Sequence, residues 1–250
     1  MKRTSVAAAA GAAALATGAI VASSYISPTA VMIVTAVACL LTAVGWPYVL
    51  RVPARKSLST AIGLSALLAV VLTGTTPGPS FLTWFPASVA LGVGAVFMIQ
   101  LLRGTGQSLR LESTLGASAG AVIVGMGSGW VAADRLFANA ADSGMTLVTG
   151  VSVLVAIAVS LLPFPDRIVA PVAVALAALA GPLGALLFTD VPALAAAVVG
   201  LACGVVIAGT RRLLVGREAP LAVIAAVAAG IAPVLAIGAV VYLLDKLFLT

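Results

Sequence analysis

The sequence predicts an all-α membrane protein, a polytopic bundle of about nine transmembrane helices with its amino terminus inside the cell and its carboxyl terminus outside. Only 8% of the 250 residues are charged and 62% are hydrophobic, whereas about a quarter of the residues in a soluble domain are charged. The apolar residues fall into runs of membrane length, since a spanning helix needs about 20 of them. Basic residues separate alternate runs. We therefore expect hydrocarbon, not water, to surround most of the chain.

The first apolar run, residues 6–23, follows Lys2 and Arg3 and is rich in alanine and glycine. A short apolar core followed by small residues is also typical of a signal peptide, but we expect this segment to be retained as the first span. Eight further runs are separated by charged or Gly/Pro-rich turns. They cover residues 29–49, 58–73, 81–102, 111–133, 144–162, 168–188, 191–210 and 219–244.

The basic residues set the predicted orientation. Cytoplasmic loops of membrane proteins carry an excess of lysine and arginine, and only Arg135 and Lys246 fall on the side opposite the amino terminus. The other eleven of the 13 basic residues are Lys2, Arg3, Arg51, Arg55, Lys56, Arg103, Arg110, Arg167, Arg211, Arg212 and Arg217. This bias predicts the N-in, C-out topology.

Residues 1–250 are predicted to form a single integral membrane domain, because no soluble stretch of domain length interrupts the apolar runs. The most polar stretch, residues 103–112, carries three charges in ten residues. It could connect two halves, residues 1–110 and 111–250.

The fifth run, residues 111–133, is expected to be a middle member of the bundle. Three of its glycines are spaced by four and seven and lie within about 40° on one helical face, and two more lie on the opposite face. Small residues let membrane helices approach closely, so packing is the first interpretation; a sliding or pore-lining surface is the alternative. The eighth run carries two similar glycines. The predicted packing residues are Gly116, Gly120, Gly125, Gly127, Gly129, Gly200 and Gly204.

Glu112 lies in the first turn of the fifth run, where the helix dipole favours a carboxylate, so its first interpretation is a helix start. The alternative is that it pairs with Arg103 or Arg110 and gates the inner mouth of a substrate route. All seven acids fall at or beyond predicted membrane edges, which argues against a carboxylate at mid-bilayer that couples transport to protons or sodium. Those expected to be solvated acids of external loops are Asp134, Asp142, Asp190 and Asp245.

Two glycine–proline patterns predict helix breaks in the carboxyl-terminal half. Gly181-Pro182-Leu183-Gly184 interrupts the seventh run, and Gly230 and Pro233 interrupt the ninth. Helix breaks at membrane depth mark binding sites in many transporters, and a simple kink is the alternative.

Several kinds of chemistry are disfavoured. The chain has no histidine, which removes imidazole catalysis and the commonest metal ligand, and Cys39 and Cys203 lie inside apolar runs. The glycine-rich residues 125–129 lack the lysine of a phosphate-binding loop. We expect no enzymatic activity, no cofactor and no metal. An enzyme acting on a lipid carrier stays open only if Asp134, Asp142 and Asp190 cluster at an external cleft.

Gly45-Trp46-Pro47, a basic inner loop leading to Leu111-Glu112-Ser113 and the glycine-rich run after it resemble a family of uncharacterised, permease-like membrane proteins of high-GC Gram-positive bacteria. The resemblance implies a multi-pass protein of the bacterial plasma membrane and transfers no catalytic residue.

Two hypotheses for function follow. In the first, the protein is permease-like and handles a neutral or lipid-like molecule near the two broken helices. In the second, it is a non-catalytic assembly or scaffold subunit of a cell-envelope membrane complex. The expected partners are membrane lipids and other membrane protein subunits. Nucleic acid is not expected, because the basic residues are dispersed between apolar runs.

Overall fold

The computed structural model describes residues 2–77, 80–104, 109–137, 144–215 and 221–248. Every regular element in these ranges is an α-helix, so the predicted all-α bundle is confirmed. The helices are α1 (Lys2–Ser24), α2 (Pro28–Leu50), α3 (Arg55–Thr75), α4 (Phe85–Leu102), α5 (Arg110–Gly125), α6 (Ser128–Phe137), α7 (Gly144–Ser160), α8 (Asp166–Phe188), α9 (Ala193–Val215) and α10 (Val223–Phe248).

Eight stretches of the described residues are long and apolar enough to cross a membrane, and α5 and α6 share one of them, Arg110–Leu136. The ninth, α7, is an apolar helix of 17 residues, about 25 Å long. It is therefore slightly short for a hydrocarbon core of about 30 Å. The chain is a multi-pass integral membrane protein with the predicted helix order.

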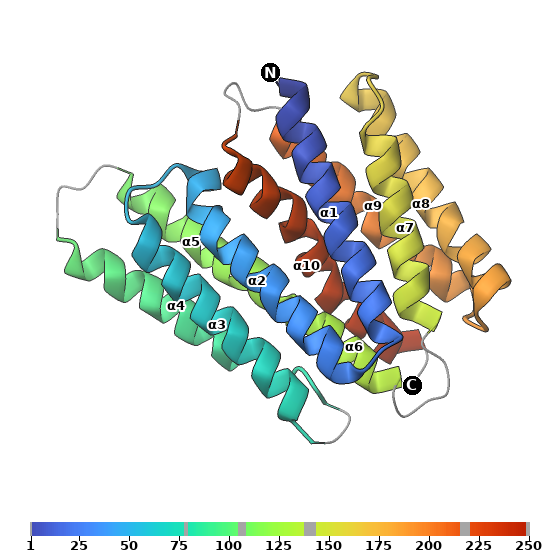
Figure 1. The fold of residues 1–250 in the computed structure, drawn as a ribbon, viewed down its shortest axis with the longest axis horizontal. Helices are drawn as coiled ribbons and strands as arrows, with labels where there is room; N and C mark the ends of the chain where they lie inside the picture. Colours follow the sequence, from blue (N-terminus) through green and yellow to red (C-terminus); the bar gives the residue numbers. More distant parts are fainter. Residues whose placement is uncertain (1, 78–79, 105–108, 138–143, 216–220, 249–250) are drawn as a thin grey trace.

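The two chain ends lie at opposite ends of the bundle (Figure 1), as an odd number of crossings requires. Because successive helices alternate in direction, the described basic residues separate as the sequence predicts, with Arg135 and Lys246 alone at the far end. Arg217 lies outside the described residues. The end that carries the amino terminus is called the inner end below, on the basis of this charge bias.

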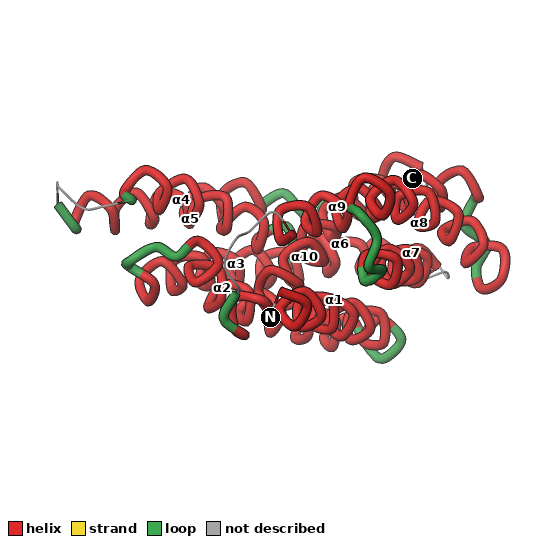
Figure 2. The backbone as a smooth tube through the Cα atoms, turned by 90° about the horizontal axis from the view of Figure 1, so that it is seen from above, coloured by secondary structure: helices red, strands yellow, loops and turns green. Residues whose placement is uncertain are grey.

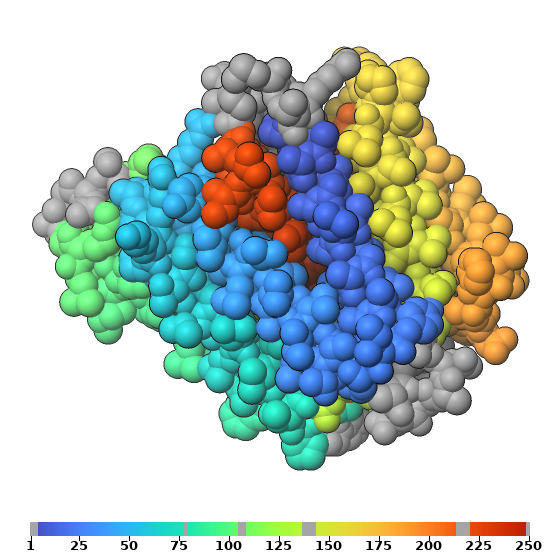
Figure 3. Space-filling model, in the orientation of Figure 1, coloured from blue at the N-terminus to red at the C-terminus, as the bar shows by residue number. Residues whose placement is uncertain are grey.

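Helix α10 is the hub of the bundle. It packs against α1, α2, α5, α6, α7 and α9, and 72% of its most apolar window is buried, compared with 22% for α1 and for α4. One group of helices, α2 to α5, lies on one side of α10 and the group α7 to α9 lies on the other (Figures 1 and 2). Helix α1 covers the front and lies against α7, and part of α10 is visible between α1 and α2 (Figure 3).

The sequence explains several helix boundaries. Helix α2 begins at Pro28, which suits a first helical turn, and the hydroxyl of Ser27 accepts a hydrogen bond from the Ala30 N–H at 3.1 Å. It ends at Arg51, whose φ of 57° lies in the left-handed region. Helix α8 begins immediately after Pro165, with Asp166 in its first turn, where the helix dipole favours an acid.

The glycine face of the fifth span lies against α2. A Cβ atom added to Gly116 would lie 2.7 Å from a methyl carbon of Leu50, and one added to Gly120 would overlap the indole ring of Trp46. That indole also donates a hydrogen bond to the Gly116 carbonyl at 2.9 Å. A Cβ atom added to Gly127 would lie 3.1 Å from the Cys39 sulfur on α2 and 2.7 Å from a methyl carbon of Leu235 on α10. The absence of side chains on this face therefore sets the distance between the two helices.

The glycines on the opposite face contact two different helices. Gly125 faces α4, where a Cβ atom would lie 3.3 Å from the ring of Phe85. Gly129 lies against the backbone of α10 at Ala239. The fifth span is thus enclosed by α2, α3, α4 and α10.

The structure corrects the position of the helix breaks. Helices α8 and α10 run without interruption through Pro182 and Pro233, so the predicted breaks are absent from both. The interruption instead falls between α5 and α6, at residues 126–127. Nearby side chains satisfy backbone groups there: the Ser128 hydroxyl donates to the Gly125 carbonyl at 2.8 Å, and the Cys39 thiol donates to the carbonyl of Val124 at 3.4 Å.

Candidate functional site

The three residues considered for an inner gate lie at the inner end, between α4 and α5. Glu112 is exposed in the first turn of α5, whereas Arg103 and Arg110 are half-buried. A buried hydrogen bond at this junction runs from the Gln100 amide to the Ser113 hydroxyl. The sequence signal for this contact is a glutamine inside the apolar run of residues 81–102.

Two acids expected to be solvated are buried, which corrects that expectation. Asp245 is fully buried, and neither carboxylate oxygen has a hydrogen-bond partner within the described chain. Asp134 on α6 is 9% exposed. The physical reason is that α10 continues past the predicted boundary at residue 244 to Phe248, so Asp245 belongs to the packed helix. Asp190 is exposed.

Asp142, one of the three acids of the external cleft considered for an enzyme, lies outside the described residues. Within the part of the chain that the structure describes, no group of three histidine, cysteine or acidic side chains could hold a metal ion. Cys39 and Cys203 are buried free thiols, and each lies within a membrane span.

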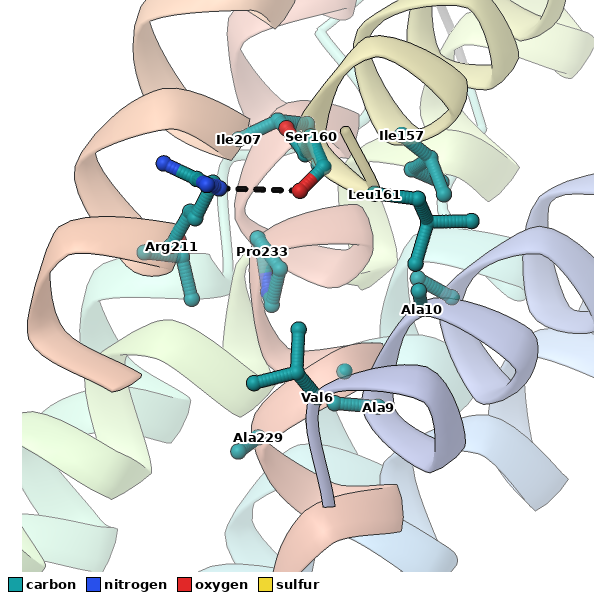
Figure 4. Close-up of a pocket in the computed structure, with 13 residues that line it drawn as sticks. Val6, Ala9, Ala10, Ile157, Ser160, Leu161, Ile207, Arg211, Ala229 and Pro233 are labelled. Carbon is teal, nitrogen blue, oxygen red and sulfur yellow. Dashed lines mark hydrogen bonds between the residues drawn. The ribbon is translucent and has the colours of Figure 1, made fainter. Parts of the chain in front are cut away.

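The cavity that the structure places beside the predicted substrate route lies between α1, α7, α9 and α10, in the inner half of the bundle (Figure 4). Its volume is about 50 Å³, which is room for roughly three to five water-sized groups and so for a short segment of a narrow chain, not for a bulky polar solute. Alanine, valine, isoleucine and leucine side chains form most of the wall, including Ala10 and Ile157.

Only part of the predicted route reaches this cavity. Gly230 and Pro233 line it, whereas Gly181, Pro182 and Gly184 do not. Gly181 packs against the backbone of α9, and a Cβ atom on Gly184 would lie 3.8 Å from a side chain of α7. These positions belong to the packing of α7, α8 and α9.

Two further glycines fix how closely α8 and α9 pack. A Cβ atom on Gly200 would lie 3.0 Å from the Cα atom of Ala178, and one on Gly204 would lie 2.7 Å from the Cα atom of Val174. Because these contacts are with backbone, neither position tolerates a side chain without a shift of the helices.

Gly230 and Pro233 shape the cavity in different ways. Gly230 lets α10 approach α1, because a Cβ atom there would overlap the backbone of Ala9, 2.7 Å from its carbonyl carbon. Pro233 has no N–H, so the carbonyl of Ala229 loses its usual helical donor. Ala229 and Pro233 both line the cavity, so the proline leaves a carbonyl acceptor in a mostly apolar wall.

The inner end of the cavity is polar. Arg211 lines it, donates from Nε to the Ser160 carbonyl at 2.8 Å (Figure 4) and forms an ion pair with Asp166 through a terminal nitrogen. Arg212 donates from Nε to the other oxygen of Asp166 at 2.8 Å. The Arg211 side chain is 10% exposed and the Arg212 side chain 60%. Two guanidinium groups thus share one carboxylate and leave a net positive charge.

The sequence indicated only an orienting role for these arginines. Asp166 lies 45 residues from Arg211 in the sequence, so no local sequence pattern predicts that they pair. The available signal was a lone acid directly after the proline turn at residues 163–165, on the side of the membrane where basic residues gather.

No protein-family model matches this chain, and no match was found among curated proteins or solved structures. The features that bear on function are therefore the apolar bundle, the cavity between four of its helices and the charged cluster at the inner end of that cavity.

Proposed function

We propose that this integral membrane protein is permease-like and admits a lipid-like molecule into the cavity between α1, α7, α9 and α10. The observation that carries the proposal is the cavity itself, a mostly apolar space of about 50 Å³ between four helices. Sites for small molecules occur preferentially between the helices of bundles. The resemblance to permease-like proteins supports the same class of function, in the bacterial plasma membrane.

The chemistry of the wall favours an alkyl chain over a polar solute. Wall residues such as Val6, Ala13 and Ile207 offer no hydrogen bonds from their side chains, and a polar group placed among them without a partner would cost several kcal/mol. A hydrocarbon chain entering from the bilayer exchanges one apolar environment for another, so it pays no such penalty.

A pair of substitutions on α1 tests the proposal. Ala10 is half-buried and lines the cavity, whereas Ala7 is exposed on the same helix and does not line it. We expect Ala10→Leu to reduce the lipid that co-purifies with the protein, measured by native mass spectrometry, because leucine adds three carbon atoms to a space of about 50 Å³. Ala7→Leu is the matched control and is expected to leave lipid binding unchanged. Equal lipid retention in both variants would rule the cavity out as the binding site.

A scaffold role is the second candidate, and α1 provides the observation that favours it. Its exposed face carries Ala7, Gly11, Gly18 and Ala22, and a Cβ atom at either glycine would meet nothing within 4 Å. Small residues four apart are typical of helix–helix contacts in membranes. In this case a partner subunit would co-purify stoichiometrically in mild detergent and would be lost on Gly11→Leu. A monodisperse single chain that retains lipid would count against it.

We further propose that the protein is not an enzyme and needs no cofactor. The hydroxyl of Ser128, in the glycine-rich segment, donates to the carbonyl of Gly125, and the sequence has no histidine to activate it. Incubation of the purified protein with labelled lipid is expected to return the lipid unaltered.

A further inference from the structure

The geometry points to an anionic amphiphile as the ligand of this cavity, with its head group bound by Arg211 and Arg212 and part of one alkyl chain lying in the space between α1, α7, α9 and α10. This inference rests on the proposed function and adds the class of head group. The apolar wall selects for an alkyl chain but does not distinguish one lipid head group from another.

The charge of the cluster is the first argument. Arg211, Arg212 and Asp166 together carry one net positive charge, since one carboxylate is shared by two guanidinium groups. A guanidinium group has five N–H donors, and in the described chain Arg212 uses only Nε, on Asp166. Its two terminal nitrogens remain as donors, and paired donors of this kind suit phosphate oxygens.

The burial of Arg211 is the second argument. Its side chain is only 10% exposed, so its charge is less screened by water and salt than that of a surface arginine. It is also held in place, because Nε donates to the Ser160 carbonyl and a terminal nitrogen pairs with Asp166. A positive charge fixed at the end of an apolar cavity is a preorganised site for an anion attached to a hydrocarbon chain.

The packing of α8 and α9 explains why the charges meet at this place. Asp166 lies in the first turn of α8, and Arg212 lies in the last turn of α9, positions that the helix dipoles favour for an acid and a base respectively. The two helices pack closely along the glycines of α9, which brings the start of one beside the end of the other. The cluster is therefore built by the fold and is not an accidental surface pair.

The placement favours a lipid over a free anion. The cavity runs from Arg211 to Ala13 and is apolar beyond its charged end. That charged end lies at the inner end of the bundle, the level of the head groups of the cytoplasmic leaflet, where anionic lipids are concentrated. An alkyl chain gains little free energy when it moves from the bilayer into the cavity. Binding therefore distinguishes between lipids mainly through the head group.

The test uses the full-length protein in detergent, titrated with phosphatidylglycerol, phosphatidylcholine or inorganic phosphate and read by native mass spectrometry. We expect the wild type to prefer phosphatidylglycerol to phosphatidylcholine by roughly three- to fivefold, the upper end of what one partly exposed charge contributes. Arg212→Ala is expected to abolish this preference. Arg212 does not line the cavity itself, but it shares Asp166 with Arg211, which does. Arg167→Ala is the matched control, because Arg167 is exposed at the same end and has no ion pair with Asp166 in the described chain, and it is expected to keep the preference.

Arg212→Ala is chosen over Arg211→Ala because Arg212 is 60% exposed and its loss leaves the Arg211–Asp166 pair intact. Equal binding of the two lipids by the wild type, or equal loss in Arg167→Ala, would overturn the inference. The inference would also be overturned if inorganic phosphate bound as tightly as phosphatidylglycerol and Ala10→Leu had no effect on binding. This combination would indicate a site for a free anion. If Ala10→Leu weakens both lipids alike while head-group charge has no influence, the cavity function stands and only the head-group assignment fails.

Discussion

Replacement of Gly230 by alanine gives a direct test of the contact between α1 and α10. The added Cβ atom would lie 2.7 Å from the carbonyl carbon and 2.9 Å from the Cα atom of Ala9. Both neighbours are backbone atoms, so α1 must move as a whole to relieve the overlap. Overpacking of this kind typically costs about 1–3 kcal/mol.

Gly11→Ala is the matched control, because a Cβ atom at Gly11 would meet nothing within 4 Å. Alanine is favoured over glycine in a helix by about 1 kcal/mol, so we expect this variant to be as stable as the wild type or slightly more stable. For a chain of this size, about 1 kcal/mol corresponds to roughly 3 °C in melting temperature. Because both variants gain this helix preference, Gly230→Ala is expected to melt roughly 3–9 °C below Gly11→Ala.

The assay is thermal unfolding of the purified protein in detergent, followed by size-exclusion chromatography with fluorescence detection. If Gly230→Ala and Gly11→Ala melt at the same temperature, α1 is not in close contact with α10, and the wall of the cavity is not built as described. A lowered melting temperature for Gly11→Ala alone would point to the opposite face of α1 as the packed one.

Two further expectations concern buried side chains. Asp245→Leu is expected to raise the melting temperature by several degrees, because a buried polar group left without a partner costs about 1–3 kcal/mol and both carboxylate oxygens of Asp245 lack a partner in the described chain. Asp190→Leu, at an exposed position, is expected to change it little. An unchanged or lower melting temperature for Asp245→Leu would show that the carboxyl is paired. Cys39 and Cys203 are 0% and 1% exposed, so we expect neither thiol to react with a maleimide reagent until the protein is denatured. Labelling is measured by mass spectrometry, and rapid labelling of the folded protein would contradict their burial.

The sequence predicted the fold class and the helix order because both follow from where apolar residues run and where charges interrupt them. It placed the helix breaks wrongly, since proline and glycine are local signals and the outcome depends on neighbours. Pro182 and Pro233 are accommodated inside continuous helices. The break between α5 and α6 contains no proline and is accompanied by the bond from Cys39 to Val124.

The cavity could be predicted only in part, because its wall comes from four helices that are distant in the chain. The glycine–proline pattern identified Gly230 and Pro233, which line the cavity. No local sequence pattern indicates that Arg211 lies beside them. Pairing of Arg211 with Asp166 requires knowing that α8 and α9 pack antiparallel. Asp245 was misplaced for a simpler reason, because a charged pair at residues 245–246 ended the apolar run before the helix itself ends.

The most direct test of the proposed function is a density map of the full-length protein in a nanodisc that contains phosphatidylglycerol. We expect an elongated feature between α1, α7, α9 and α10 that passes Ala10 and ends in a compact head beside Arg211 and Arg212. A map in which α1 lies flush against α7 and α9, with side chains filling the space beside Pro233 and no lipid there, would contradict the account.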